Sequence, residues 1–194
     1  SVSEHLPGFV MRYRADIDAN SLIWKVGDKP DVRGVITANA AIPTLLGVTV
    51  RLYAPSGVIV TERVADYTLA TGAFKLILPA ILTERKEGLV YVSALEDSTY
   101  TRTLTAEISA SASSAELTGS TGALPDAGFC LIESEWCQYT LSGSTLTFVS
   151  RAIFNTTAAI HAISTTVKFA SCKETCTPDY PFTVRDVMEL WTPI

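Results

Sequence analysis

Histidine is the scarcest side chain in this sequence that could serve as a general base. The 194 residues include two, His5 and His161, and a hydrolytic triad or a histidine-containing metal centre would have to be built around one of them. His161 has no Asp, Glu or Cys within several residues, and His5 lies in a segment of mixed polarity. We therefore interpret His161 as a single buried or hydrogen-bonded histidine, and we predict no catalytic residue, no metal ligand and no cofactor.

Two carboxylates stand close together at the tip of a predicted hairpin. Glu133 and Glu135 are two residues apart, and paired carboxylates cleave glycosidic bonds when they face each other across a substrate and one of them is desolvated. Acids at a hairpin tip are usually solvated, so we interpret both as surface residues. The chain also has no phosphate-loop glycine pattern, dinucleotide fingerprint or nucleophile elbow. Together these observations predict a protein that is not an enzyme.

The four cysteines could bind a metal or form disulfides. Cys172 and Cys176 lack a second matching pair and a nearby histidine, which argues against a zinc site. They lie in a polar, turn-like stretch, where a disulfide between them is conceivable. Cys130 and Cys137 fall on the two arms of the predicted hairpin, near but not directly opposite each other. For this second pair we predict buried free thiols.

The charge balance excludes other classes of function. Fifteen basic and 20 acidic side chains give a net charge of −5, and the adjacent basic pair Arg85-Lys86 is flanked by acids. A nucleic-acid-binding protein needs clustered cations, so we predict no nucleic-acid partner. No apolar stretch approaches the roughly 20 residues of a membrane span. Residues 1–5 lack the features of a signal peptide, which predicts synthesis in a cytoplasm.

Short strands separated by turn residues dominate the first half of the chain. Val48, Val50 and Leu52 alternate with polar side chains, which is the period of a half-buried strand. Roughly seven such runs predict an antiparallel sandwich over residues 21–108, preceded by an N-terminal arm at 1–20. A short helical turn fits only residues 79–87. The predicted strands are 22–26, 32–38, 46–53, 58–64, 73–78, 89–94 and 99–108.

A second β-rich unit follows a change in composition. Residues 109–115 are Ser and Ala alone, which predicts a linker. Residues 116–170 then contain further runs typical of strands, and a core of this size is thin without a neighbour to dock on. The predicted strands are 128–132, 136–140, 145–149 and 165–169. The fold class is therefore all-β, with two small β-rich domains.

The last segment, 171–194, carries a helical pattern. Its apolar side chains recur at the spacing of one helix face, which predicts a short helix at about 183–191. Such a short helix is marginal alone. It could cover the protein's own core or insert into a partner, and the second alternative makes its apolar face a candidate partner-binding site. That face comprises Val184, Val187, Met188 and Trp191.

Seven short motifs follow one another within residues 117–167, over about a quarter of the chain. They are LPDAGF at 124–129, LI at 131–132, Glu135, YT at 139–140, GSTLT at 143–147, Arg151 and TTAAIH at 156–161. Their order and spacing resemble a small β-domain that recurs in bacteriophage tail and virion proteins. Four family glycines are replaced here by Ser134, Ala152, Asn155 and Ser164. The resemblance implies that the shared Arg and His are structural.

The first half contains IWKVGD at 23–28, LGVTVRL at 46–52 and GAF at 72–74. These motifs have a looser resemblance to the immunoglobulin-like N-terminal domain of phage upper-baseplate and tail proteins. The two resemblances imply an immunoglobulin-like sandwich followed by the small phage-type domain.

Together the resemblances imply a structural component of a phage virion, made in the host bacterial cytoplasm. We expect a baseplate or tail adaptor that links the tail body to peripheral parts such as fibres. Its partners would be other tail, baseplate or fibre proteins and further copies of itself in a symmetric assembly. The alternatives are a neck, collar or capsid decoration protein, or a receptor- or glycan-binding module that uses Trp136 and Tyr139.

Overall fold

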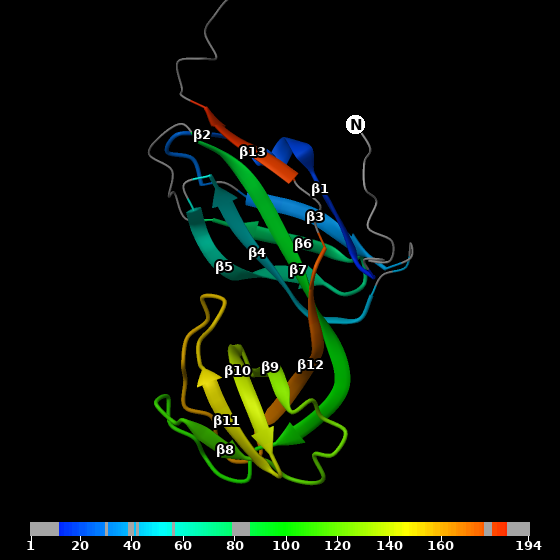
Figure 1. The fold of residues 1–194 in the computed structure, drawn as a ribbon, viewed down its shortest axis with the longest axis vertical. Coiled ribbons are helices and arrows are strands. Elements are labelled where there is room, and N and C mark those ends of the chain that lie inside the picture. The colour runs from blue at the N-terminus through cyan, green and yellow to red at the C-terminus, as the bar shows by residue number, and fades with distance from the viewer. Residues whose placement is uncertain are drawn as a thin grey trace, which may run out of the picture.

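The computed structural model describes residues 12–29, 31–38, 41, 43–55, 57–78, 86–176 and 180–185. These residues form two lobes stacked along the long axis of the molecule (Figure 1). The large lobe holds most of residues 12–97, and the small lobe holds most of residues 101–170. The described part of the chain is all-β apart from one short 3-10 helix, η1 (Ala19–Leu22).

Most strands belong to one lobe, and two are shared between them. The large lobe contains β1 (Arg14–Ile17), β2 (Ile23–Lys25), β3 (Asp31–Thr37), β4 (Leu45–Ala54), β5 (Gly57–Thr68), β6 (Ala73–Ile77) and β13 (Tyr180–Arg185). The small lobe contains β8 (Ser114–Glu116), β9 (Ala127–Ile132), β10 (Glu135–Ser142) and β11 (Thr145–Ser150). The shared strands are β7 (Lys86–Thr103) and β12 (Thr166–Thr175).

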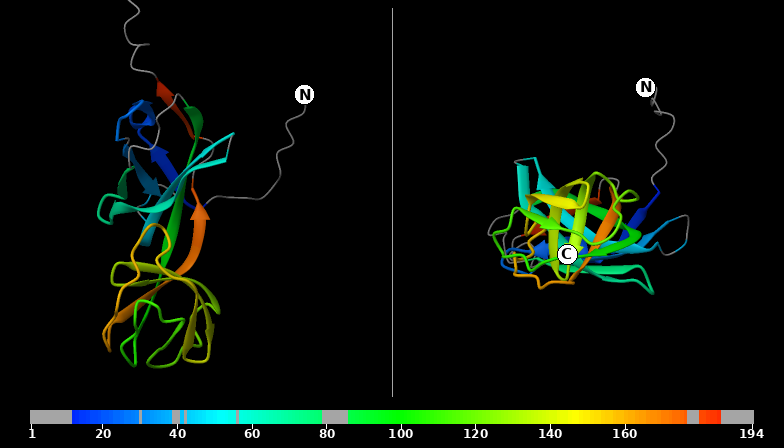
Figure 2. Two further views of the ribbon diagram at one scale, coloured as in Figure 1. Left: turned by 90° about the vertical axis from the view of Figure 1, so that its left-hand side faces the viewer. Right: turned by 90° about the horizontal axis from the view of Figure 1, so that it is seen from below.

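The strands join in one large, mainly antiparallel sheet. Its order is β1-β3-β6-β5-β4-β7-β12-β9-β10-β11-β8, and β13 adds to the start of β7 and pairs in parallel with β2. In the small lobe the sheet curls until Leu117, just after β8, bridges Leu104, just after β7. The view from below in Figure 2 looks along the long axis onto this curled sheet.

The two shared strands carry the backbone from one lobe into the other (Figure 1). The first part of β7 pairs with β4 and β13, and its end, at residues 101–103, pairs with the start of β12. The register between β7 and β12 shifts twice where they pass between the lobes. Thr99 has a φ of 65° at this passage. The lobes are therefore linked by two paired, irregular strands.

A cluster of apolar side chains fills the contact between the lobes. This interlobe cluster consists of Leu95, Trp136, Phe154 and Ala170. Phe154 also accepts a backbone hydrogen bond from Val64 of β5 at 3.0 Å. Beside it, Lys173 Nζ lies 2.6 Å from a carboxylate oxygen of Glu62. Side chains from both lobes thus pack together at this contact.

The strand pattern in the sequence anticipates most of this sheet, with several differences in detail. The runs predicted at 89–94 and 99–108 belong to the single strand β7, which ends at Thr103. Within the predicted arm, Arg14–Ile17 forms β1, and Ala15 and Ile17 are buried in the large lobe. Residues 1–11 of the arm and 79–85 of the predicted helical turn lie outside the described residues, whereas 86 and 87 begin β7.

The Ser- and Ala-rich stretch at 109–115 does not run between the lobes. Ile108 before it and Ala115 at its end are both buried in the core of the small lobe. The chain enters the small lobe earlier, within β7, because that strand continues without a break past the large lobe. Residues 109–114 are mostly exposed, so this stretch is a surface segment of the small lobe that leads into β8 and not a linker between the lobes.

The fit of Trp136 against Gly47 can be tested by adding one methyl group. A Cβ at Gly47 would lie 2.7 Å from Cζ2 of the indole, closer than packed carbon atoms tolerate. We expect Gly47→Ala to lower the free energy of unfolding by about 1–3 kcal/mol through overpacking, measured by urea denaturation. Gly122→Ala is the matched control, because the nearest atom to its Cβ is a Ser120 hydroxyl at 4.0 Å. Equal stability of the two variants would contradict the described contact.

Candidate functional site

The hairpin of β9 and β10 directs its side chains alternately into the two cores. Its turn consists of Glu133 and Ser134, and Glu133 has a φ of 55°. On β10, Glu135, Cys137 and Tyr139 are buried on the face toward the small-lobe core, and Trp136 faces the interlobe cluster. Alternation along a strand therefore carries the Glu135 carboxylate into the protein interior.

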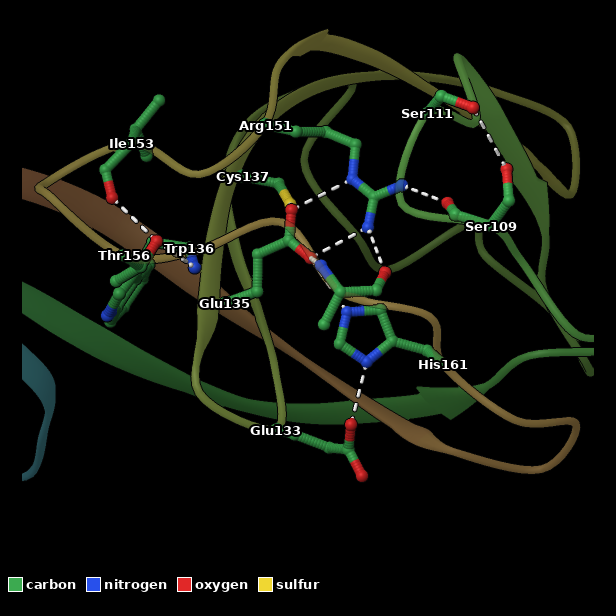
Figure 3. Close-up of polar contacts among 11 residues, drawn as sticks. Ser109, Ser111, Glu133, Glu135, Trp136, Cys137, Arg151, Ile153, Thr156 and His161 are labelled. Atoms are coloured by element: carbon green, nitrogen blue, oxygen red, sulfur yellow. Dashed lines mark hydrogen bonds and ion pairs between the residues drawn. The ribbon is translucent and has the colours of Figure 1, made fainter.

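The prediction that both hairpin acids are solvated is right for Glu133 and wrong for Glu135. The Glu133 side chain is 61% exposed, whereas that of Glu135 is 1% exposed. A buried carboxylate is costly unless charged or hydrogen-bonding groups replace its water. Here those groups come from loop segments on the same side of the small lobe (Figure 3).

Arg151 forms a two-pronged ion pair with Glu135. Its Nε donates to Oε1 at 2.8 Å and its Nη2 donates to Oε2 at 2.7 Å. The remaining donors bind main-chain carbonyls: Nη1 that of Ser109 at 2.5 Å and Nη2 that of Ala159 at 2.9 Å. The guanidinium also lies over the ring of Phe148, 5.0 Å from its centroid. One buried cation thus joins β10 to two separate loops.

His161 bridges the buried and the exposed carboxylate. Its Nε2 lies 2.8 Å from Oε2 of Glu135, and its Nδ1 lies 2.7 Å from Oε2 of Glu133. Each ring nitrogen therefore faces one carboxylate oxygen within hydrogen-bond distance. The main chain of His161 exchanges two hydrogen bonds with Ile108, at 2.9 and 3.0 Å. The contacts of the imidazole ring and the backbone hydrogen bonds of His161 therefore hold the same residue of the loop in place.

The surroundings of Glu135 favour its ionised form. Burial alone would raise the pKa of this carboxyl, but the bonds from Arg151 and His161, and one from the Ala159 backbone N–H at 3.0 Å, outweigh it and lower the pKa to about 2. The Cys137 thiol adds a weak contact to Oε1 at 3.6 Å. Glu135 is thus a charged group with all of its strong partners inside the protein.

Left-handed backbone conformations shape the loop that carries Arg151 and His161. Ala152, Asn155 and Ser164 have φ values of 55°, 61° and 67°. Three non-glycine residues therefore adopt the backbone geometry that glycine tolerates best. At the hairpin turn the left-handed residue is Glu133 and not Ser134. Such conformations are unfavourable for non-glycine residues, so tertiary contacts must hold them.

The hydrogen bonds and ion pairs of these residues are made within the protein, and they hold β10 and the neighbouring loops together. The two carboxylates meet through the imidazole of His161, whereas glycosidic cleavage requires them to face a substrate between them. Both sides of Glu135 and all three nitrogens of the Arg151 guanidinium are engaged by protein groups. We call Glu135, Arg151 and His161 the buried network, and the exposed Glu133 is joined to it through His161. The network binds β10 to residues 109 and 151–161.

The structure places the other candidate residues differently from the sequence patterns. Thr183, Val184 and Arg185 lie in β13 and pair with residues 23–25 of β2, so the predicted helix does not begin at 183. Parallel pairing with β2 and antiparallel pairing with β7 provide hydrogen-bond partners for this backbone. The candidate partner-binding residues Val187, Met188 and Trp191 lie outside the described residues.

Trp136 and Tyr139, considered for glycan binding, are buried side chains. They are 2% and 0% exposed, respectively. Tyr139 belongs to the small-lobe core, and Trp136 belongs to the interlobe cluster. Neither ring therefore offers an exposed face for a sugar to stack on.

Two expectations about the cysteines are wrong. Cys130 and Cys137 are direct cross-strand partners, because the strands flank a turn of only two residues. Cys172 lies in β12 and Cys176 just after it, not in a turn. Four residues of extended chain span about 13 Å, whereas a disulfide requires Cα atoms within about 7 Å. A bond between Cys172 and Cys176 is therefore excluded in this fold.

Among the described residues, no group of three or more His, Cys, Asp or Glu side chains is placed to hold a metal ion. No helix there is long and apolar enough to cross a membrane.

Comparison with known proteins adds no relative. No protein-family model matches the chain, and neither a curated protein sequence nor a solved structure matches it.

Replacing Arg151 by an uncharged residue should show how much stability the buried Glu135 carboxylate loses without its main partner. We expect Arg151→Met to lower the free energy of unfolding by about 3–5 kcal/mol, because a buried carboxylate loses its main partner. Urea denaturation at neutral pH measures this loss. Arg14→Met is the control, because Arg14 pairs with Asp16 on the surface with a side chain that is 74% exposed. A loss at Arg151 no larger than that at Arg14 would show that the network contributes little.

The lowered pKa of Glu135 predicts a distinct acid dependence. Its folded-state pKa of about 2 lies below the ordinary 4.5, so its contribution to stability is complete above about pH 4.5 and disappears as the pH falls toward 2. We expect the free energy of unfolding of Glu135→Gln to fall less between pH 5 and 2 than that of the unchanged protein. Glu107→Gln, at an exposed position, should retain the original slope. Parallel curves for all three proteins would refute this assignment.

Proposed function

We propose that this protein is a non-enzymatic structural component of a bacteriophage tail, acting as a baseplate or tail adaptor. The observation that carries the proposal is the buried network. Glu135, Arg151 and His161, on which the resemblance to the phage virion domain partly rests, bind one another inside the small lobe. Because these charged residues hold loops in place, they favour a structural module that acts through the shape of its surface.

The link between the lobes supports a role as a spacer. Two paired strands cross from one lobe to the other, and the interlobe cluster packs side chains between them. An adaptor between a tail body and a fibre must keep its two ends at a set separation, and such a link resists bending better than a single peptide. We further infer that the large lobe is a variant of the immunoglobulin-like sandwich of upper-baseplate proteins.

The proposed partners are other tail, baseplate or fibre proteins and further copies of this chain in a symmetric assembly. The proposed contact segment is 186–194, which contains Val187, Met188 and Trp191. Apolar side chains of this size can each contribute about 1.5–3 kcal/mol when an interface buries them, before ordering costs. Neither a cofactor nor a nucleic acid is required for this role.

Electron microscopy of phage particles with a gold-tagged antibody tests the proposal directly. We expect label at the distal end of the tail in particles of the phage that encodes the chain. Label at the neck or head would instead favour the collar or decoration alternative. The absence of label from every intact particle would overturn the structural assignment, provided that the antibody binds the protein released from dissociated particles.

Truncation of the chain tests the contact segment separately. We expect deletion of residues 186–194 to abolish incorporation into particles while the free chain keeps its urea unfolding midpoint. The cut must follow Arg185, because Phe182 is 1% exposed in the large-lobe core and β13 pairs with β7. Phe182→Ala is the contrasting variant, since it should lower stability. Normal incorporation of the truncated chain would contradict a role for this segment.

A further inference from the structure

The hairpin that carries Glu135 also brings two thiols together. Cys130 on β9 and Cys137 on β10 are direct partners in the antiparallel register. Both are 0% exposed and both belong to the small-lobe core, so their side chains lie on the same face of the hairpin. Contact with the Cys137 thiol, followed by burial, raises the pKa of Cys130.

We infer that Cys130 and Cys137 are a disulfide-forming pair, which closes when the small lobe folds in the presence of a low-molecular-weight disulfide. Directly opposed residues of antiparallel strands have Cα atoms about 4.5–5.5 Å apart. Disulfides span Cα separations of about 4.4–6.8 Å. The bond therefore forms with little movement of the backbone. Both thiols are buried and free in the structure, which confirms the prediction made for them from the sequence, and the inference concerns the same pair in the presence of an oxidant.

The remaining cysteines have other surroundings. Cys172 contacts Arg12 and Glu96, with its sulfur 2.8 Å from Nη2 and 3.2 Å from Oε2, respectively. Cys176 is buried in the large-lobe core. Neither lies in the core that holds Cys130 and Cys137, so the fold favours one specific pairing.

The chemistry is thiol–disulfide exchange with oxidised glutathione as the co-reactant. One cysteine thiolate attacks a glutathione sulfur, forms a mixed disulfide and releases one glutathione thiolate. The second cysteine thiolate then attacks the protein sulfur of that mixed disulfide and releases the second glutathione. The two cysteines are oxidised, one glutathione disulfide is reduced to two thiols, and two protons leave the cysteines. Because both side chains are buried in the folded state, this exchange takes place before the core closes.

Refolding the full chain from urea in oxidised and reduced glutathione tests the inference. Free thiols are blocked in denaturant, and mass spectrometry of the tryptic peptide that contains both residues then locates the bond. We expect this peptide to be lighter by two hydrogen atoms and to carry no blocking group. Cys172 and Cys176 should not form a bond with each other. Free thiols at 130 and 137, or their pairing with Cys172 or Cys176, would overturn the inference.

A stability measurement supplies the matched control. The oxidised chain should unfold at a higher urea concentration than the reduced chain, since the bond restricts the unfolded hairpin. Cys137→Ala should abolish that difference, whereas Cys172→Ala should retain it. An equal difference in both variants would assign the stabilisation to another bond. These outcomes depend on the geometry of the hairpin and not on the proposed place in a virion.

Discussion

The small lobe depends on neutralising one negative charge in its interior. Period-two alternation directs Glu135 inward with Cys137 and Tyr139, and the carboxylate needs compensation there. Compensation comes from Arg151, His161 and a backbone N–H, all on a loop with little regular structure. Neutralising this charge therefore requires one conformation of the loop, which the backbone preferences of the loop would not select by themselves.

The same loop also connects the lobes. Arg151 and His161 hold it to the small-lobe core, and Phe154 between them packs in the interlobe cluster and accepts a hydrogen bond from β5. One segment thus contributes both to the buried network and to the contact between the lobes. This arrangement explains how three left-handed residues, Ala152, Phe154 and Asn155, persist so close together.

Much of the sheet could be predicted from local pattern because strand alternation and turn residues are local signals. The runs that became β4, β9 and β11 are examples. The burial of Glu135 could also have been predicted. Alternate residues of a strand face the same side, and Glu135 alternates with the core residues Cys137 and Tyr139. The opposition of Cys130 and Cys137 follows from simple counting outward from a two-residue turn. A hairpin acid looks solvated, however, when its partners lie 16 and 26 residues away in the sequence.

The C-terminal region shows the limit of periodicity. Residues 183–185 fit a helical stripe, yet they form a strand because β2 and β7 provide edges for pairing. The continuity of β7 was equally hidden, since its polar centre passes between two cores that local patterns cannot reveal. Long-range pairing decided the structure at both places.

The course of β7 has a consequence for biosynthesis. Residues 89–96 of this strand pair on one side with β4, which precedes them. On the other side, β13 pairs with residues 86–90 and the end of β12 pairs with residues 93–96, and both follow their partners by at least 75 residues. The large lobe thus encloses the small one in sequence, and its sheet stays incomplete while the ribosome makes everything in between. An edge of β7 remains open during that interval, which is a hazard for aggregation. The sheet of the large lobe is therefore completed only after β12 and β13 have been made.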